Sequence, residues 1–321
     1  MNGIQNALNP AGPNAASLSH LWWLMFWINS AVYLLVLIAL AFAIRNGRRE
    51  RDLDPVLNPR PKTERRMRNV VLSATIVTTA ILFVFLLSSF RVGRSLTADI
   101  ANKNGLSIEV TGRQWWWEVR YNDVDASNIF TTANEIHIPV GVPVLFTLHG
   151  GDVIHSFWVP NLAGKKDLIP GKVSTLWLQA DKPGVYRGQC AEYCGLQHAR
   201  MAFWVVADTQ EQFNAWRQNQ TQTSIQPSTD SQRRGQQVFM SSTCVMCHAI
   251  NGTTAASNVG PNLTHIGSRN TIAAATLSNT REHLARWIVD SQQFKPGNKM
   301  PQNNLGQDDL NALVDYLQSL K

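Results

Sequence analysis

Two long apolar segments near the start of this 321-residue chain limit what it can fold into. Residues 21–44 form one run, interrupted only by Asn29 and Ser30, and residues 69–90 form a second run without a charged side chain. At a rise of about 1.5 Å per residue, each run can cross a hydrocarbon core of about 30 Å as a helix. Core helices of soluble proteins seldom run so long without charge, so we expect two membrane-spanning helices.

Basic residues gather between the two apolar segments. Residues 45–68 contain nine Lys and Arg against four Asp and Glu, and the whole net charge of +7 falls within residues 1–94. Loops that remain in the cytoplasm carry such an excess of basic residues. We therefore predict a two-pass protein of the bacterial inner membrane, with residues 1–94 forming a hairpin, a cytoplasmic loop at 45–68 and both termini on the periplasmic side. The charge reports topology, so no nucleic-acid partner is expected.

Beyond residue 107 the pattern changes to short apolar runs separated by turn residues. The sequences Gly-Val-Pro and Lys-Pro-Gly, at 141–143 and 182–184, are typical turn signals. We predict strands at 135–140, 143–148, 175–179, 184–189 and 202–206. The pattern favours an antiparallel β-sandwich or barrel, and we assign residues 95–208 to it.

The remainder of the chain divides into a polar stretch and a helical one. Residues 209–230 are rich in Gln, Ser and Thr, which predicts a helix end at 211–217 followed by a flexible linker. Residues 231–321 have helical apolar spacing and are expected to form a small all-α domain. The last predicted helix places five apolar side chains on one face: Leu310, Leu313, Val314, Leu317 and Leu320.

Four soft metal ligands lie within twelve residues of the β-domain: Cys190, Cys194, His198 and Met201. Two thiolates, an imidazole and a thioether favour copper or zinc over magnesium, and the thioether is absent from the usual zinc ligand set. His155 is the best candidate for a second imidazole from elsewhere in the barrel. A disulfide between the two cysteines is the structural alternative in an exported domain.

Residues 244–248 read Cys-Val-Met-Cys-His, which is the attachment signature of c-type haem. In this signature Cys244 and Cys247 form thioether bonds to the porphyrin, and His248 lies beneath the iron. The sequence therefore predicts a covalently bound haem c in the helical domain.

The sixth ligand of the haem iron has more than one candidate. Met300 is the one methionine after the attachment site, and His265 and His283 are the alternatives. The tail resembles the class I cytochrome c fold, in which a Gly-Pro-Asn-Leu segment lies below the haem and a Met-Pro pair lies above it. Because the chain matches both segments, the resemblance implies Met300 as axial ligand and implies that the carbonyl of Pro261 orients His248.

Residues 112–206 resemble the copper domain of cytochrome c oxidase subunit II, a cupredoxin-like Greek-key β-barrel. The family's pattern Cys-x-Glu-x-Cys-x-x-x-His-x-x-Met is matched without a gap, and the chain also has the upstream histidine of the family. The matching residues are His155, Cys190, Glu192, Cys194, His198 and Met201. With the helix hairpin in front, the resemblance covers residues 20–207.

The resemblance implies a binuclear copper A centre. Cys190 and Cys194 would bridge the two copper ions, and His155 and His198 would each bind one of them. Met201 would be a weak ligand. Shared thiolates and rigid ligation suit a site that exchanges electrons without rearrangement.

The resemblance also relates the copper domain to its partners. The backbone carbonyl of Glu192 would be a further weak copper ligand, and its side chain would help to hold a magnesium ion at the contact with subunit I.

Residues 112–117 match the aromatic patch of the family, in which Trp115 corresponds to the electron-entry tryptophan. Three adjacent tryptophans alternate faces on a strand, so at least one should be exposed. Arg113 and Trp116 stand where the family usually has His and Tyr.

Together the parts resemble subunit II of a haem-copper oxidase with a fused cytochrome c, as in caa-type terminal oxidases. The resemblance implies electron transfer from an external cytochrome or other donor to haem c, to copper A and to haem in subunit I, with reduction of O2 to water and proton translocation there. Subunit I, subunit III and membrane lipid are the implied partners. The two apolar runs hold no His or carboxylate, so the oxygen site lies in another subunit.

Three other classes of protein share some of these features. Quinol-oxidase subunit II has the hairpin and barrel but lacks the copper ligands, and nitrous oxide reductase has the copper motif on a soluble enzyme without this hairpin. A membrane-anchored haem and copper redox sensor, or a copper-delivery protein without oxidase activity, is the alternative from a different class. No kinase, DNA-binding or other output domain is recognisable in the sequence.

Overall fold

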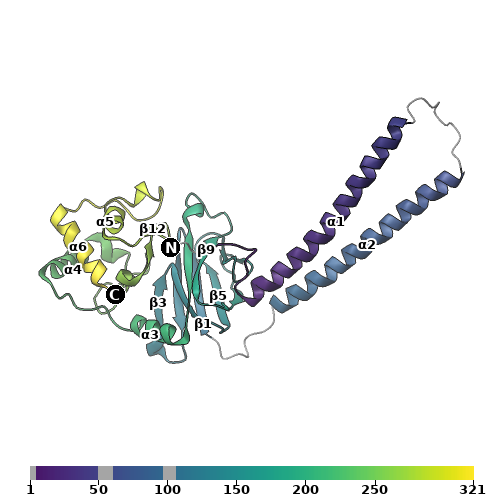
Figure 1. Ribbon diagram of the computed structural model, residues 1–321. Coiled ribbons are helices and arrows are strands. Elements are labelled where there is room, and N and C mark those ends of the chain that lie inside the picture. Colours follow the sequence, from purple (N-terminus) through teal and green to yellow (C-terminus); the bar gives the residue numbers. More distant parts are fainter. Residues whose placement is uncertain (1–4, 50–60, 97–105) are drawn as a thin grey trace. The chain divides into compact units, whose positions relative to one another are not determined.

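The computed structural model describes residues 5–49, 61–96 and 106–321. Along the chain it contains two long helices, a β-sandwich and a helical C-terminal domain (Figure 1). The two helices form one compact unit, and the sandwich with the C-terminal domain forms the other. The predicted order of hairpin, β-domain and all-α domain is confirmed.

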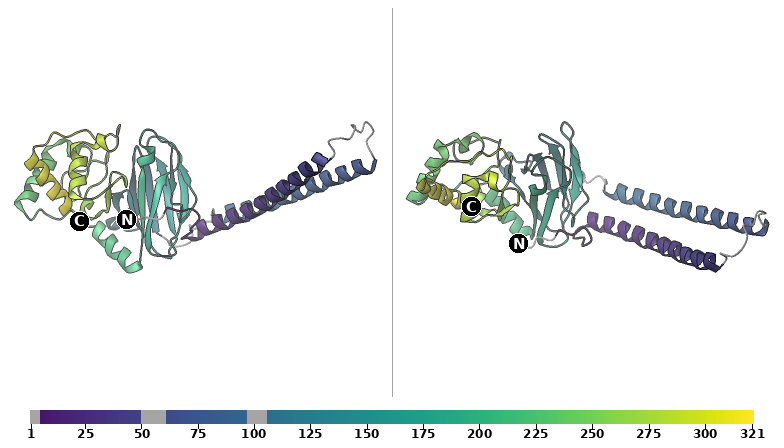
Figure 2. Two further views of the ribbon diagram at one scale, coloured as in Figure 1. Left: turned by 45° about the horizontal axis from the view of Figure 1, so that its top comes forward. Right: turned by 90° about the horizontal axis from the view of Figure 1, so that it is seen from above.

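The hairpin consists of α1 (Pro13–Arg49) and α2 (Pro61–Leu96), which run in opposite directions (Figure 2). Both helices extend beyond the predicted apolar runs, and both begin at a proline, whose fixed φ suits a first helical turn. Their large apolar side chains are exposed, for example Leu35 at 65% and Phe83 at 60%. Soluble proteins rarely expose such a surface, and both helices are long and apolar enough to cross a membrane, as the sequence predicts. Residues 50–60 of the predicted cytoplasmic loop lie outside the described residues.

Two five-stranded sheets make up the sandwich. The first has the order β3-β2-β1-β5-β8: β3 (Phe130–Ala133), β2 (Trp116–Asn122), β1 (Leu106–Arg113), β5 (Val144–Gly150) and β8 (Ser174–Leu178). The second has the order β4-β10-β9-β6-β7: β4 (Glu135–Pro139), β10 (Ala202–Asp208), β9 (Gly184–Cys190), β6 (His155–Trp158) and β7 (Lys166–Leu168). All five predicted strands are present, with ends that differ from the prediction by at most two residues. Residues 97–105, near the predicted start of this domain, lie outside the described residues.

The expectation of an antiparallel sandwich is wrong at two strand pairs. Strand β1 pairs with β5 in parallel, and β4 pairs with β10 in parallel. Alternation of apolar and polar residues shows which face of a strand is buried, but it carries no information about the direction of the neighbouring strand.

Aromatic side chains between the two sheets hold the strands that will carry the site. Trp117, Phe157 and Phe203 are fully buried; the ring centroids of Phe157 and Phe203 are 4.5 Å apart, and those of Trp117 and Phe157 are 5.8 Å apart. A Cβ on Gly188 would lie 2.2 Å from the Phe203 ring, so β9 can pack here only with glycine. This packing fixes β6, which begins at His155, next to β9, which ends at Cys190.

Helix α3 (Gln210–Gln220) occupies the first half of the segment that was expected to be mostly linker. It begins with a capping box between Thr209 and Gln212. Phe213 is 3% exposed, and the Trp216 ring stacks on the His137 ring with centroids 4.2 Å apart. Two aromatic residues therefore suffice to pack an otherwise polar helix against the barrel.

The C-terminal domain is built from α4 (Asp230–Ser241), α5 (Arg281–Val289) and α6 (Gln307–Ser319). It also has a pair of two-residue strands, β11 (Thr271–Ile272) and β12 (Leu277–Ser278), so it is not purely helical. The five apolar residues of the predicted α6 face are all buried. They form a core with residues of the other helices, among them Phe239 of α4.

Helices α4 and α6 touch at Gly235. A Cβ added there would lie 2.0 Å from the Ala312 carbonyl oxygen and 2.7 Å from the Tyr316 Cβ. We expect Gly235→Ala to destabilise the domain by about 1–3 kcal/mol through overpacking. Native-state hydrogen exchange of the full chain should then show amides of α4 and α6 exchanging about 5–150-fold faster.

Gly306→Ala is the matched control, because nothing lies within 4 Å of its added Cβ. At this N-cap position alanine should cost less than about 1 kcal/mol. Equal effects of the two substitutions would contradict the packing explanation.

Candidate functional site

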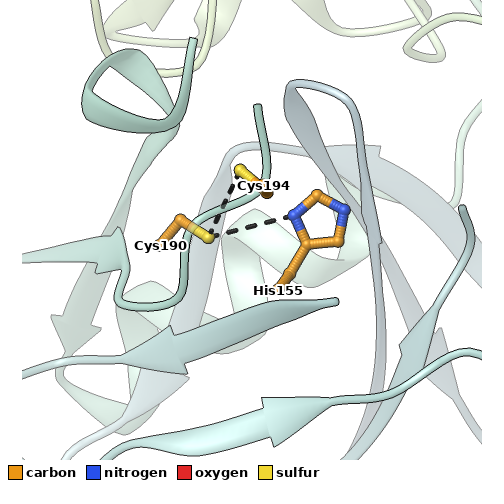
Figure 3. Close-up of side chains that lie close together, drawn as sticks. All are labelled: His155, Cys190 and Cys194. Carbon is orange, nitrogen blue, oxygen red and sulfur yellow. Dashed lines mark hydrogen bonds between the residues drawn. The ribbon is translucent and has the colours of Figure 1, made fainter. Parts of the chain in front are cut away.

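The connection between β9 and β10 brings two thiols next to the first residue of β6 (Figure 3). The Cys190 Sγ lies 3.8 Å from the Cys194 Sγ and 3.9 Å from the His155 Nδ1. The ligand atoms of these three buried residues all lie within 4.8 Å of one another. A disulfide needs sulfur atoms about 2.05 Å apart, so both thiols are free and the disulfide alternative is excluded in this structure.

The remaining predicted copper ligands surround the same pair of thiols. The His198 Nδ1 and the Met201 Sδ lie 3.7 Å and 3.8 Å from the Cys194 Sγ. The Glu192 carbonyl oxygen lies 3.2 Å from the Cys190 Sγ. The Glu192 side chain is instead 45% exposed, with a carboxylate oxygen 3.3 Å from the Lys165 Nζ. The structure thus brings all six predicted copper residues together, and of Glu192 it brings only the main chain into the pocket.

The backbone closes this loop tightly. The Cys190 amide donates to the Met201 carbonyl over 2.9 Å, and the Ala191 amide donates to the Ser156 carbonyl over 2.9 Å. Gly195 turns the loop with a φ of +110°, a conformation that side chains other than glycine rarely adopt. These backbone bonds and the turn at Gly195 fix the positions of the two sulfur atoms within the fold.

The electrostatics of the pocket favour a thiolate. The neighbouring Cys194 thiol, and then His155, lower the pKa of Cys190 to about 3. Hydrogen bonding with Cys190, and then burial, raise the pKa of Cys194, so the pair keeps one proton near neutral pH. Burial alone would lower the pKa of His155, but hydrogen bonding with Cys190 and Asp152 outweighs burial and raises it. A soft cation that displaces the shared proton fits this set of donors.

Asp152 is a functional residue that the sequence reasoning missed. Its Oδ1 lies 2.8 Å from the Nε2 of the fully buried His155, so the Nδ1 of that ring is left facing Cys190. Backbone amides of Gln114 and Val153 each donate to the same carboxylate over 2.7 Å. Its position three residues before a candidate histidine was the available signal. A carboxylate that fixes the ring orientation of a ligand histidine is a common support for a metal site.

Trp115 joins the metal loop to the aromatic patch. Its indole Nε1 donates to the Cys194 carbonyl over 2.9 Å, and the residue is 8% exposed. Trp117 is fully buried, and Trp116 is half-buried with the Arg113 guanidinium 5.9 Å from its ring centroid. The expectation that at least one of the three tryptophans is exposed is therefore wrong. The Trp115 ring is instead turned toward the copper loop, where its indole bonds the Cys194 carbonyl, and Arg113 lies beside the Trp116 ring.

The predicted haem attachment residues lie on one short turn, η3 (Thr243–Met246), and the residues after it. The amides of Cys247 and His248 donate to the Cys244 carbonyl over 3.2 Å and 3.0 Å. The His248 Nδ1 lies 2.7 Å from the Pro261 carbonyl oxygen, and a Cβ on Gly260 would be 2.8 Å from the ring. Burial lowers the pKa of His248, so the ring is neutral and its Nε2 is left for an iron ion.

The candidates for the sixth ligand differ in the contacts that their potential ligand atoms make within the protein. Both ring nitrogens of His265 face backbone carbonyl oxygens, of Lys321 at 3.1 Å and Gln222 at 3.2 Å. The His283 Nδ1 faces the Ser278 carbonyl at 3.0 Å. For Met300, the main chain is fixed by hydrogen bonds from and to the preceding segment, and no contact of its sulfur is recorded in the described residues. The half-buried Met300 thus fits the role of sixth ligand better than His265.

Two protein-family models match the chain. The model described as cytochrome C oxidase subunit II, periplasmic domain, matches residues 125–208, and the model described as cytochrome c matches residues 232–321. These two stretches coincide with most of the β-sandwich and with the C-terminal domain.

Relatives of known identity match over long stretches. The chain is 36% identical to cytochrome c oxidase subunit 2 of Alkalihalophilus pseudofirmus, over 98% of this chain and 90% of that protein. It is 33% identical to cytochrome c oxidase subunit 2 of a Bacillus species, over 68% of this chain and 64% of that protein. Among solved structures, the periplasmic domain of subunit II of cytochrome oxidase of Bradyrhizobium japonicum is 32% identical, with 36% of this chain and 92% of that chain covered and a TM-score of 0.34.

The role of Asp152 can be tested through metal affinity. Asp152→Asn removes the negative charge that orients His155. The NH2 group of the new side chain then faces either the two backbone amides or the His155 ring. We expect copper affinity of the full chain to fall about 10–100-fold in competition with a chelator. Asp308→Asn, an exposed carboxylate in the first turn of α6, is the control and should leave the affinity unchanged. Wild-type affinity in Asp152→Asn would refute the orienting role.

Proposed function

The chain belongs to the cytochrome c oxidase subunit 2 family, and on that premise we propose that it holds a binuclear copper A centre in its β-sandwich and one covalent haem c in its C-terminal domain. It is an electron-transfer subunit of a haem-copper oxidase, an oxidoreductase complex in which it works with subunit I. The copper and haem domains are both implied by the family, whereas the number of metal ions and the ligands of each are proposals.

One observation carries the binuclear assignment: two free thiols lie 3.8 Å apart in one pocket, and each has its own imidazole. In our proposal Cys190 and Cys194 would be shared by the two copper ions, and His155 and His198 would each hold one of them. Met201 and the backbone carbonyl of Glu192 would be weak ligands. A single zinc ion would need only four of these donors and would leave the thioether without a role.

The haem would be held by Cys244 and Cys247 through thioether bonds, with His248 and Met300 on the two sides of the iron. The 2.7 Å hydrogen bond to the Pro261 carbonyl supports this, because it fixes the His248 ring in the tautomer that binds iron. When bound, haem c and the copper pair each accept and release one electron. The protein residues bind these groups, orient them and exclude water from the copper pocket.

The position of the domains in the cell is a further part of the proposal. The basic segment at 45–68 supports a cytoplasmic loop in the bacterial inner membrane, so both termini would lie on the periplasmic side. The exposed Glu192 carboxylate, on the copper loop, is available to a magnesium ion at the contact with subunit I. Trp115 would receive electrons on the path to copper. Subunit III and an external cytochrome or other donor complete the proposed partners.

The alternative, a redox sensor or copper-delivery protein without oxidase activity, is not favoured. The match to an oxidase subunit extends over 98% of this chain, which includes the hairpin, both redox domains and the connection between them.

Metal analysis of the full chain, purified in detergent, tests the proposed cofactors. We expect two copper ions and one haem c per chain, with one unpaired electron shared between the two copper ions in the oxidised form. Cys194→Ser should abolish that shared state and leave the visible spectrum of the haem unchanged. One copper ion per chain, or none, would contradict the binuclear assignment.

Tethering of the two redox domains predicts how the haem-to-copper step responds to salt. Because the two sites lie on one chain, their encounter does not depend on long-range attraction between charges. We expect the rate constant after flash reduction of the haem to change less than about twofold between low and high ionic strength, where the Debye length falls from about 30 Å to about 3 Å. A steep decrease of the rate with salt would show that the step depends on a charge-steered encounter.

A further inference from the structure

The segment that precedes Met300 contains a buried lysine that reaches the copper domain. Lys295, in the loop after η5 (Ser291–Gln293), is 2% exposed. Its Nζ donates to the Trp115 carbonyl over 2.8 Å and to the Ala273 carbonyl over 3.3 Å. One ammonium group thus joins two segments of the C-terminal domain to the residue that borders the copper loop.

The neighbours of Lys295 contact the copper loop as well. The Gln197 side chain donates to the Pro296 carbonyl over 2.6 Å, and the Arg200 guanidinium donates to the Phe294 carbonyl. These two bonds run from the copper-binding segment to residues 294 and 296 of the Met300 loop, on either side of Lys295. The loop proposed to hold the haem iron and the loop proposed to hold copper are therefore bonded to each other directly.

A second segment of the C-terminal domain completes this interface. The Ala202 amide donates to the Ala274 carbonyl over 3.2 Å. The Asn270 amide donates to the Glu135 carboxylate over 3.1 Å. These two amides report contact between the domains, because each has its acceptor on the other domain.

A charged ammonium group at the buried position of Lys295 costs free energy. Burial lowers the pKa of Lys295 to about 7, and the hydrogen-bond acceptors recorded for its ammonium are neutral carbonyls. An apolar side chain of the same length would fill the space without removing a charge from water. A contribution to stability alone does not explain an ammonium group at this position. Directional hydrogen bonds to the Trp115 and Ala273 carbonyls do explain it.

Trp115, which accepts the hydrogen bond from Lys295, is itself hydrogen-bonded to the copper loop. Lys295 bonds the Trp115 carbonyl, and the Trp115 indole donates to the Cys194 carbonyl over 2.9 Å. Two hydrogen bonds and one tryptophan therefore link the Met300 loop to a proposed copper ligand.

We propose that Lys295 is a positioning residue that holds the Met300 loop of the cytochrome domain against Trp115 of the copper domain. The two domains then exchange electrons from one fixed arrangement, without a docking movement before each transfer. The electron-transfer part rests on the proposed function, whereas the docking part concerns the polypeptide alone.

Hydrogen exchange of the full chain tests the docking part. Lys295→Met keeps the length and the apolar stem but removes the donor, and Lys321→Met removes an exposed lysine as control. We expect the Ala202 and Asn270 amides to exchange at least about tenfold faster in Lys295→Met, with amides of α4 and α6 unchanged and the control identical to wild type. Unchanged exchange at both interface amides would overturn the proposal.

The dependence of the haem-to-copper rate on viscosity tests the electron-transfer part. A fixed arrangement predicts no change of the wild-type rate with added glycerol. In Lys295→Met the domains must find each other first, so the rate should fall as viscosity rises. A viscosity-dependent rate in wild type, or a viscosity-independent rate in the variant, would overturn this part.

Two further observations keep the outcomes distinct. If Lys295→Met accelerates exchange in α4 and α6, the substitution has damaged the cytochrome domain itself. Both measurements are then repeated with Lys295→Gln, whose side chain is shorter and polar. Failure of the proposed function would appear as missing copper or haem in the metal analysis, which is a separate measurement from the exchange of the interface amides.

Discussion

Two buried thiols that stay free are the constraint on which the rest of this structure depends. Cys190 and Cys194 lie 3.8 Å apart, near enough to share a proton and too far apart for a disulfide. To hold them there, β9 must lie against β6, and Gly188 must let Phe203 approach the strand. The loop to β10 must also close, which it does through the amide of Cys190 and the carbonyl of Met201. The fold thus holds the donor set in place, and rigid ligation of this kind favours rapid electron exchange.

The features that the sequence predicts well are those set by local order along the chain. The length of the apolar runs predicts the two apolar helices, and residue types and spacing within the copper loop predict four of its ligands, from Cys190 to Met201, whereas Glu192 follows only from the family resemblance. The haem attachment turn is equally local, since Cys244, Cys247 and His248 meet within one short helix and its end. His155 lies far from these in the chain; the residues alone offered it as a candidate imidazole, and the family resemblance then supported its place in the same pocket.

The features that the sequence does not reveal depend on contacts between distant segments. Two parallel strand pairs follow from chain topology, which residue alternation does not encode. The polar composition of α3 hides the two aromatic residues that pack it on the barrel, Phe213 and Trp216. Asp152 and Lys295 look like ordinary surface charges in the sequence, and the resemblance that points to Trp115 does not show its bonds to Lys295 and the copper loop. These contacts form only where the copper domain meets its own loop or the cytochrome domain.

The central claim is that both redox sites belong to one chain and exchange electrons within it. The most direct test is to reduce the haem with a light-activated donor and to follow haem oxidation and copper reduction together, over a wide range of protein concentrations. The account predicts that both signals change with a single rate constant that is the same at every concentration. A rate constant that rises in proportion to concentration would show that electrons pass between chains, and it would contradict the account.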